Sequence, residues 1–117
     1  MEDIDYSNII ELNLSNKQLN ELPDLSKYTN LEILDCYNNN LTSLNNLPTT
    51  LKKLNCSHNQ LVRLPKIPSG LQILSCHYNK LTKLPITLIS CTNLVYVDYK
   101  HNPFESSLQQ YNFINWM

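Results

Sequence analysis

Glycine is almost missing from this 117-residue chain, which contains one, Gly70. A fold built from many tight glycine turns is therefore disfavoured. Long apolar runs are missing too, so no membrane association is expected. The N-terminus, MEDIDYSNII, is acidic and lacks the layout of a secretion signal, so we expect a cytoplasmic protein, in the producing cell or in the cytoplasm of a host.

An excess of either charge is also lacking, since nine Lys and Arg stand against ten Asp and Glu, for a formal net charge of −1. That balance gives no general attraction to nucleic acid or to an anionic membrane, and we expect neither as a partner. The sequence holds no glycine-rich phosphate loop, nucleophile elbow or paired-histidine motif. We therefore expect a protein that is not an enzyme and uses no cofactor.

Leucine and asparagine are abundant instead, with 21 and 17 copies, and they recur at fixed distances. The pattern L-x-x-L-x-[LC]-x-x-N-x-L-x-x-L occurs five times, starting near residues 9, 31, 51, 71 and 94. We number positions within each repeat from these starting residues. The length fits one domain, and we predict a single repeat domain over residues 1–117 with a C-terminal cap over 105–117.

Positions four and six of each repeat are apolar and position five is polar, which predicts a short strand with one buried face. Identical spacing of the residues within successive copies lets these strands stack in parallel and in register. Prolines follow most repeats, so the return segments should be extended or polyproline-like, with an added helical turn possible in the longer segment 86–93. Residues 105–117 carry apolar residues at helical spacing and predict a short capping helix, with a frayed tail as the alternative.

The repeats resemble the leucine-rich-repeat family over about residues 9–104. Their 20-residue spacing with Leu-Pro pairs, as at Leu64-Pro65 and Leu84-Pro85, is similar to the short repeats of bacterial effector proteins. The bias toward Asn, Lys, Ile and Tyr also resembles leucine-rich-repeat proteins of giant viruses. The resemblance implies an α/β right-handed solenoid, with the strands on a concave face and the return segments on a convex side.

Position nine is Asn in four repeats and Lys17 in the first. In the family this Asn turns inward and bonds the backbone of its own turn and of the neighbouring repeat. Lys17 fits a terminal repeat, where a charge can reach water. The N-terminal residues 1–8 are too short for a substantial cap on that end.

Three cysteines share position six, Cys36, Cys56 and Cys76, and they are interpreted as buried core residues rather than a metal or disulfide site. Cys91 is expected on the return side, also in a structural role. The histidines near the strands, His58, His77 and His101, should face away from the cysteines, so no metal site is predicted. A pH-sensitive contact is the favoured alternative role for them.

Outward strand positions carry exposed Tyr and Ile, which favours a non-catalytic scaffold that binds another protein on the concave face. The alternatives are that these side chains merely cover neighbouring repeats, or that the protein is structural and self-associating through a solenoid end or the C-terminal segment. We therefore expect a monomer or a weak homodimer. The predicted partner-binding residues are Ile33, Asp35, Tyr37, Lys53, Asn55, Ile73, Ser75, His77, Tyr78, Tyr96, Asp98 and Lys100.

Overall fold

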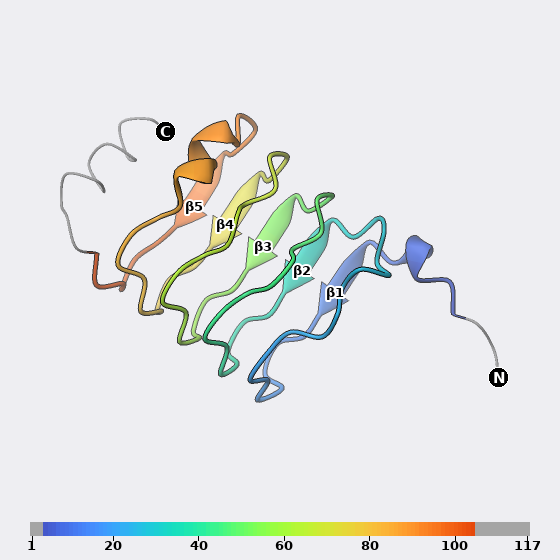
Figure 1. Cartoon of the computed structure of the whole chain (residues 1–117), viewed down its shortest axis with the longest axis horizontal. Helices are drawn as coiled ribbons and strands as arrows, with labels where there is room; N and C mark the ends of the chain where they lie inside the picture. Colours follow the sequence, from blue (N-terminus) through green and yellow to red (C-terminus); the bar gives the residue numbers. More distant parts are fainter. Residues whose placement is uncertain (1–3, 105–117) are drawn as a thin grey trace.

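Five short parallel strands, stacked side by side in sequence order, form the frame of the protein (Figure 1). The computed structural model describes residues 4–104. Each strand pairs with the next in register, so that equal positions of successive repeats lie opposite one another, as predicted. The strands are β1 (Glu11–Asn13), β2 (Ile33–Asp35), β3 (Lys53–Asn55), β4 (Ile73–Ser75) and β5 (Tyr96–Asp98).

The core runs along the inside of the coil and is built from the same positions in every repeat. At position four, Leu34, Leu54 and Leu74 are completely buried, and the thiols at position six lie beside them. Burial of each leucine side chain contributes about 1.5–3 kcal/mol. In the first repeat Leu12 and Leu14 are only partly buried, because a terminal repeat has a neighbour on one side alone.

A turn at position eight ends each strand segment, and there the backbone adopts the left-handed conformation. The φ angles at this position lie between 54° and 59° in all five repeats: Asn16, Asn38, His58, Tyr78 and His101. In this conformation the backbone N–H of His58 donates to the carbonyl of His77 in the next repeat, at 3.0 Å. Asn and His tolerate a positive φ better than most residues, whereas Tyr78 is an unfavourable residue there.

The position-nine asparagines turn inward and connect successive repeats, as predicted. The Asn59 side-chain oxygen accepts from the backbone N–H of Leu41 at 3.0 Å. Its amide donates to the carbonyls of Cys36 and Cys56, both at 3.1 Å. Asn39, Asn79 and Asn102 make the corresponding bonds, each to the preceding repeat and to its own. These bonds satisfy backbone groups that the turn would otherwise bury unpaired.

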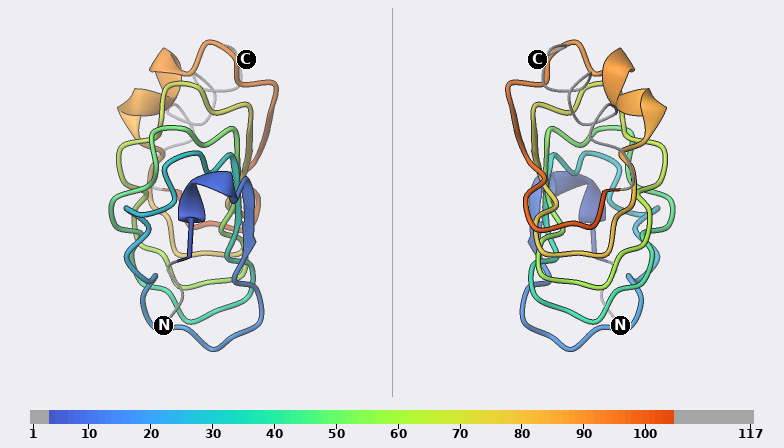
Figure 2. Two further views of the ribbon diagram at one scale, coloured as in Figure 1. Left: turned by 90° about the vertical axis from the view of Figure 1, so that its right-hand side faces the viewer. Right: turned by 90° about the vertical axis from the view of Figure 1, so that its left-hand side faces the viewer.

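The return segments are extended, apart from the 3-10 helix η2 (Ile86–Ser90) in the longer segment. Figure 2 shows η2 on the side of the coil opposite the strands. Cys91 follows η2 and is buried, which confirms its predicted place on the return side. Residues 4–104 contain no α-helix, so within this range the predicted α/β fold consists of parallel strands and 3-10 turns. The predicted capping helix over 105–117 lies outside the described residues.

At the N-terminal end, the 3-10 helix η1 (Tyr6–Asn8) lies across the opening of the first coil (Figure 2). Asp5 caps η1 by accepting from the hydroxyl and from the backbone N–H of Ser7, and these two hydrogen bonds, the hydroxyl's first, lower the pKa of its carboxyl group. The Tyr6 ring meets the edge of Tyr28 at 5.1 Å between ring centroids. This cover is thin, since Leu12 and Leu14 behind it stay partly exposed. Among the described residues, no helix is long and apolar enough to cross a membrane.

Candidate functional site

The outward side of β1–β5, formed by positions three, five and seven, is the candidate site, and we call it the strand face. The structure brings eleven of the twelve predicted residues together there, and it places Tyr78 beside them at the position-eight turn. Four of the twelve are exposed, namely Lys53, Tyr78, Tyr96 and Lys100. The others are half-buried between neighbouring repeats: Ile33, Asp35, Tyr37, Asn55, Ile73, Ser75, His77 and Asp98.

Position five of the strand face has a structural task that the sequence analysis did not foresee. The Asp35 carboxylate accepts from the backbone N–H of Tyr37 at 3.0 Å. Asn55 and Asp98 make the same bond to the residue two positions ahead, at 3.1 and 3.2 Å. Such bonds stabilise the bend that leads out of the strand. One oxygen of each of these side chains is therefore already occupied.

Ser57, His77 and Asp98 form a small polar cluster on three successive repeats. The Ser57 hydroxyl lies 2.9 Å from His77 Nδ1, and Asp98 Oδ2 lies 3.3 Å from the same nitrogen. In a catalytic triad the serine and the carboxylate occupy different ring nitrogens of the histidine. Here both meet Nδ1, and Ser57 is completely buried. The cluster has the residue types of a hydrolase site but the geometry of a structural network.

Four aromatic rings form a column along the turns, which we call the ring ladder: Tyr37, His58, Tyr78 and His101. The Tyr78 ring stacks between His58 and His101, with centroid distances of 4.5 and 4.1 Å. Tyr37 meets His58 edge-on at 5.1 Å. These contacts match the alternative interpretation in which outward rings cover neighbouring repeats. Because the faces of Tyr78 are occupied by the two histidines, its edge and hydroxyl are what a partner can meet.

The cysteine column lies inside the coil, as predicted. Cys36, Cys56 and Cys76 are completely buried and unpaired. Burial, with some repulsion from nearby Asp35 or Asp98, raises the pKa of Cys36 and Cys76 to about 12, and burial raises that of Cys56 well above its ordinary value. Thiols with so high a pKa carry little thiolate near neutral pH, and the thiolate is the form that attacks electrophiles and binds metals. The part of the chain that the structure describes contains no cluster of His, Cys, Asp and Glu able to hold a metal ion.

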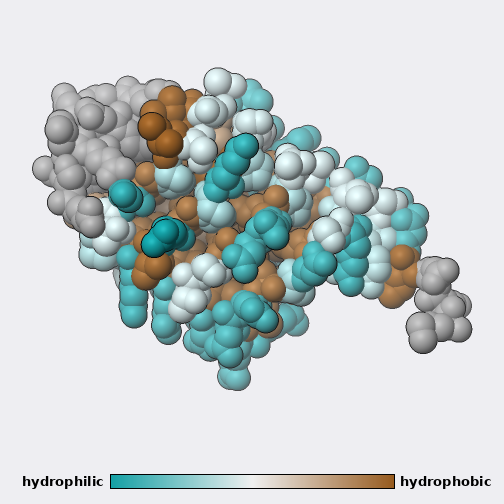
Figure 3. Space-filling view, viewed as in Figure 1, coloured by the Kyte–Doolittle hydropathy of each residue, from teal (hydrophilic) through white to brown (hydrophobic). Residues whose placement is uncertain are grey.

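The return side offers a shallow groove of about 490 Å³ between the proline-containing segments of repeats two to four. Leu47, Ile67, Pro68 and Lys66 contribute to its lining. Figure 3 views this side and shows apolar side chains gathered near η2, where Ile86 is 81% and Ile89 55% exposed. The return side therefore holds exposed apolar residues that the sequence analysis did not select.

Comparison with known proteins agrees with this geometry. Residues 50–71 match the Leucine Rich Repeat family. The chain is similar to a Shigella effector LRR domain, with 35% identity and a TM-score of 0.77, over 89% of this chain and 46% of that one. It is also similar to YopM from Yersinia enterocolitica, with 35% identity and a TM-score of 0.78, over 83% of this chain and 21% of that one. No curated protein sequence matches the chain.

The chain is therefore a leucine-rich-repeat protein with a solenoid fold. More particularly, it resembles the repeat domains of bacterial effectors, which confirms the prediction from the Leu-Pro repeats. It spans about half the length of the Shigella chain and about a fifth of YopM. The resemblance to giant-virus proteins stays a prediction.

Proposed function

We propose that the protein is a non-catalytic scaffold that holds another protein on its strand face, the concave face of a right-handed solenoid. The observation that carries this proposal is a contrast between positions. Inward positions repeat the same residues, whereas the outward position three holds Glu11, Ile33, Lys53, Ile73 and Tyr96. Successive coils can stack only if their inward positions carry similar residues. Recognition of a particular partner requires outward residues that differ from one another across the face.

Two exposed residues of the strand face are the best anchors for a partner. Tyr96 is 52% exposed on β5 and combines apolar area with a hydroxyl, as interface tyrosines do. Lys53 is exposed on β3, two strands away. The half-buried residues around them are held by contacts between repeats and supply a fixed shape rather than new bonds. Similarity to effector repeat domains supports a protein partner in a host cytoplasm, and leucine-rich repeats typically act in protein–protein interaction without catalysis.

The test compares two double variants of the full chain in capture from a eukaryotic cytosolic extract, measured by quantitative mass spectrometry. Lys53→Glu with Tyr96→Ala alters the strand face. Ile86→Ala with Ile89→Ala alters exposed apolar residues of η2 on the return side and is the matched control. We expect the first variant to lose the captured partner by about tenfold or more and the second to keep it. Equal capture by the strand-face variant and the unaltered chain would contradict the proposal.

Self-association through a solenoid end is the second candidate, because within residues 4–104 β1 has a strand neighbour on one side only. A further repeat stacked there would meet Lys17, which is exposed at the place where other repeats carry the connecting Asn. We therefore propose that the protein is a monomer or at most a weak homodimer. Light scattering across a concentration series tests this: a monomer at all concentrations removes the candidate, and a stable dimer favours it over the scaffold.

A further inference from the structure

The two halves of the solenoid carry opposite charge, although the whole chain is nearly neutral. Residues 51–104 contain seven Lys and Arg and one carboxylate, Asp98. Residues 1–50 contain eight Asp and Glu against two Lys. Repeats three to five therefore form a positively charged surface that the net charge of −1 conceals.

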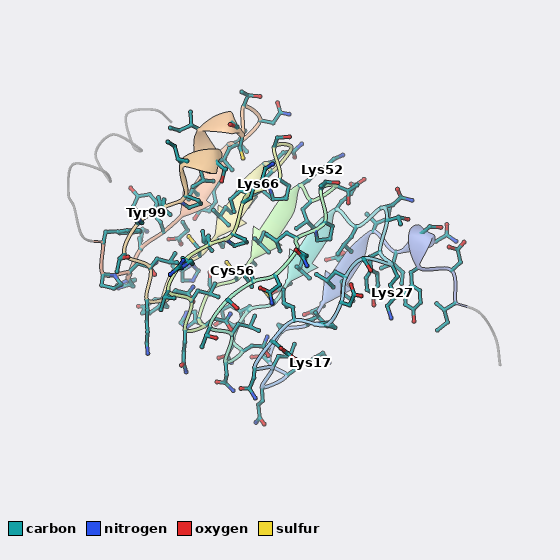
Figure 4. All side chains as sticks on the ribbon, in the orientation of Figure 1. Lys17, Lys27, Lys52, Cys56, Lys66 and Tyr99 are labelled. Carbon is teal, nitrogen blue, oxygen red and sulfur yellow. The ribbon has the colours of Figure 1, made fainter. Side chains whose placement is uncertain are left out.

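Four of the seven cations gather along one edge of repeats three to five, where the chain leaves the strands. We call this the basic edge: Arg63, Lys80, Lys83 and Lys100, all exposed. Arg63 and Lys83 occupy the same position in neighbouring repeats. In Figure 4 the label of Lys17 marks the corresponding edge of the first repeat, while Lys52 and Lys66 lie at the opposite edge.

Carboxylates are missing from the described part of the basic edge, since residues 57–63, 77–83 and 100–104 contain no Asp or Glu, and Glu105 follows outside the described residues. The nearest described acidic residue in sequence is Asp98, on the strand face. Its two oxygens already meet the Lys100 backbone N–H at 3.2 Å and His77 Nδ1 at 3.3 Å. The four cations of the basic edge are thus free of an ion pair within the described residues, where such pairs join only Lys52 to Glu32 and His77 to Asp98.

The ring ladder adjoins the basic edge and adds hydrogen-bond donors to it. Tyr78 carries a hydroxyl, and His58 and His101 carry ring N–H groups. The three rings hold one another in place by stacking, at 4.5 and 4.1 Å. A fixed row of donors stands beside four cations that have no ion pair among residues 4–104, and such a surface suits an anion. Because the rings are already held in place, binding costs less conformational entropy.

We infer that the basic edge binds an acidic segment of the partner protein. This inference rests on the proposed function, because it names the chemistry of the partner that the scaffold holds. Neighbouring strands lie about 4.8 Å apart, so repeats three to five span about 10 Å, which equals three or four residues of extended chain at about 3.3 Å each. A short run of Asp and Glu therefore fits the length of the basic edge.

Nucleic acid fits this surface less well. Binding of single strands relies on bases that stack on free aromatic faces. Both faces of the Tyr78 ring are already covered by His58 and His101. A longer strand would also run on to repeats one and two, which repel phosphate because carboxylates outnumber cations there.

The test measures binding of three labelled probes to the full chain by fluorescence anisotropy at low ionic strength: a peptide of ten Glu, a peptide of ten Gln and an oligonucleotide of ten thymidines. Two charge-reversal variants are compared. Arg63→Glu with Lys83→Glu alters the basic edge in repeats three and four, and Lys52→Glu with Lys66→Glu makes the same change in net charge at the opposite edge of repeat three. Thermal unfolding verifies that each variant is folded.

We expect the Glu peptide alone to bind, with about a tenfold loss of affinity in the basic-edge variant and less than about a threefold loss in the opposite-edge variant. Equal losses in both variants, no saturable binding of the Glu peptide, or equal or tighter binding of the oligonucleotide would each overturn the inference. The capture assay with Lys53→Glu and Tyr96→Ala keeps the two proposals apart. If that variant loses its partner while the basic edge ignores the Glu peptide, the inference fails and the scaffold stands.

Discussion

The inward and outward sides of this coil follow opposite rules. Inside, position six is Cys in three successive repeats and position nine is Asn in four. Outside, the same strands present acidic, basic, aliphatic and aromatic residues at a single position. The inner residues bond or pack against the neighbouring repeat, so one unsuitable side chain affects two repeats at once. The outer residues need not match those of the neighbouring repeat, so they can differ in ways that recognise a partner protein.

The largest effect that we expect on the inner side is the low reactivity of the buried thiols. Burial raises the pKa of Cys36 and Cys76 from 9.0 to about 12, which lowers their ionised fraction about 1,000-fold near neutral pH. We expect alkylation by iodoacetamide at pH 8 to be slower in the folded protein by at least that factor than in urea. Mass spectrometry of each cysteine measures the rates.

The same shift has a consequence for stability that can be checked with the thiols unmodified. The folded state holds these protons more tightly than the unfolded state. The thiols therefore give the free energy of unfolding no pH dependence below pH 9, and they lower it as the pH rises from 9 toward 12. Alkylation of Cys36 or Cys76 in the folded protein at the rate of the unfolded chain would contradict their burial.

Replacing Asn59 by Ala should have the next largest effect, on the free energy of unfolding. It removes the hydrogen-bond partner of the buried Leu41 N–H and one donor each to the carbonyls of Cys36 and Cys56. Those carbonyls keep a second donor, Asn39 or Asn79, so most of the loss comes from the Leu41 N–H. We expect a loss of about 3 kcal/mol in the free energy of unfolding, measured by urea denaturation.

The control for this variant is Gln60→Ala, which truncates the exposed neighbour of Asn59. The backbone N–H of Gln60 donates to the Leu41 carbonyl at 2.9 Å, and that bond survives the substitution. We expect a change below about 0.5 kcal/mol. Similar losses in the two variants would show that the inward amide is not what connects the repeats.

Tyr78 combines features of the two sides. Its backbone N–H donates to the Lys100 carbonyl of the next repeat at 3.0 Å, whereas its ring lies outside the coil. Its φ of 54° is unfavourable for any residue with a Cβ, at a cost of about 1–2 kcal/mol. Both Tyr78→Gly and Tyr78→Ala remove the ring stacking, but only glycine relieves the backbone strain. We therefore expect the glycine variant to be more stable than the alanine variant by about 1 kcal/mol in urea denaturation. The opposite order would show that the turn imposes no strain.

The sequence predicted the inner side almost completely. The identical spacing of positions within each repeat indicated the register of β1–β5, and the recurrence of Asn at position nine indicated its inward bonds. These features use the same residue at the same position of successive repeats, so the repetition in the sequence reveals them. The left-handed turn at position eight was missed, although Asn16, Asn38, His58 and His101 are residue types that favour it.

The outer side was predicted only in part, because its residues differ from repeat to repeat, so no recurring position indicates their contacts. Tyr37 and Tyr78 were chosen as exposed rings, yet each packs on His58 of a neighbouring repeat. Asp35 was chosen as a binding residue, yet it accepts from the Tyr37 N–H. The basic edge was overlooked because the charge was summed over the whole chain, where the acidic residues 1–50 offset the basic residues 51–104.

The smallest expected effect comes from Lys17, the one position-nine residue that is not Asn. Each connecting Asn accepts from the preceding repeat, and the first repeat has none before it in the described chain. The backbone of the first turn is hydrogen-bonded by the asparagine of the second repeat. Asn39 accepts from the Lys17 N–H at 3.0 Å and donates to the Leu14 carbonyl at 2.9 Å. Both Lys17→Asn and Lys17→Ala should therefore change the free energy of unfolding by less than about 0.5 kcal/mol, against about 3 kcal/mol for Asn59→Ala. A gain above about 1 kcal/mol in Lys17→Asn would mean that the asparagine acts mainly within its own turn, and that the repeats are connected by the strands alone.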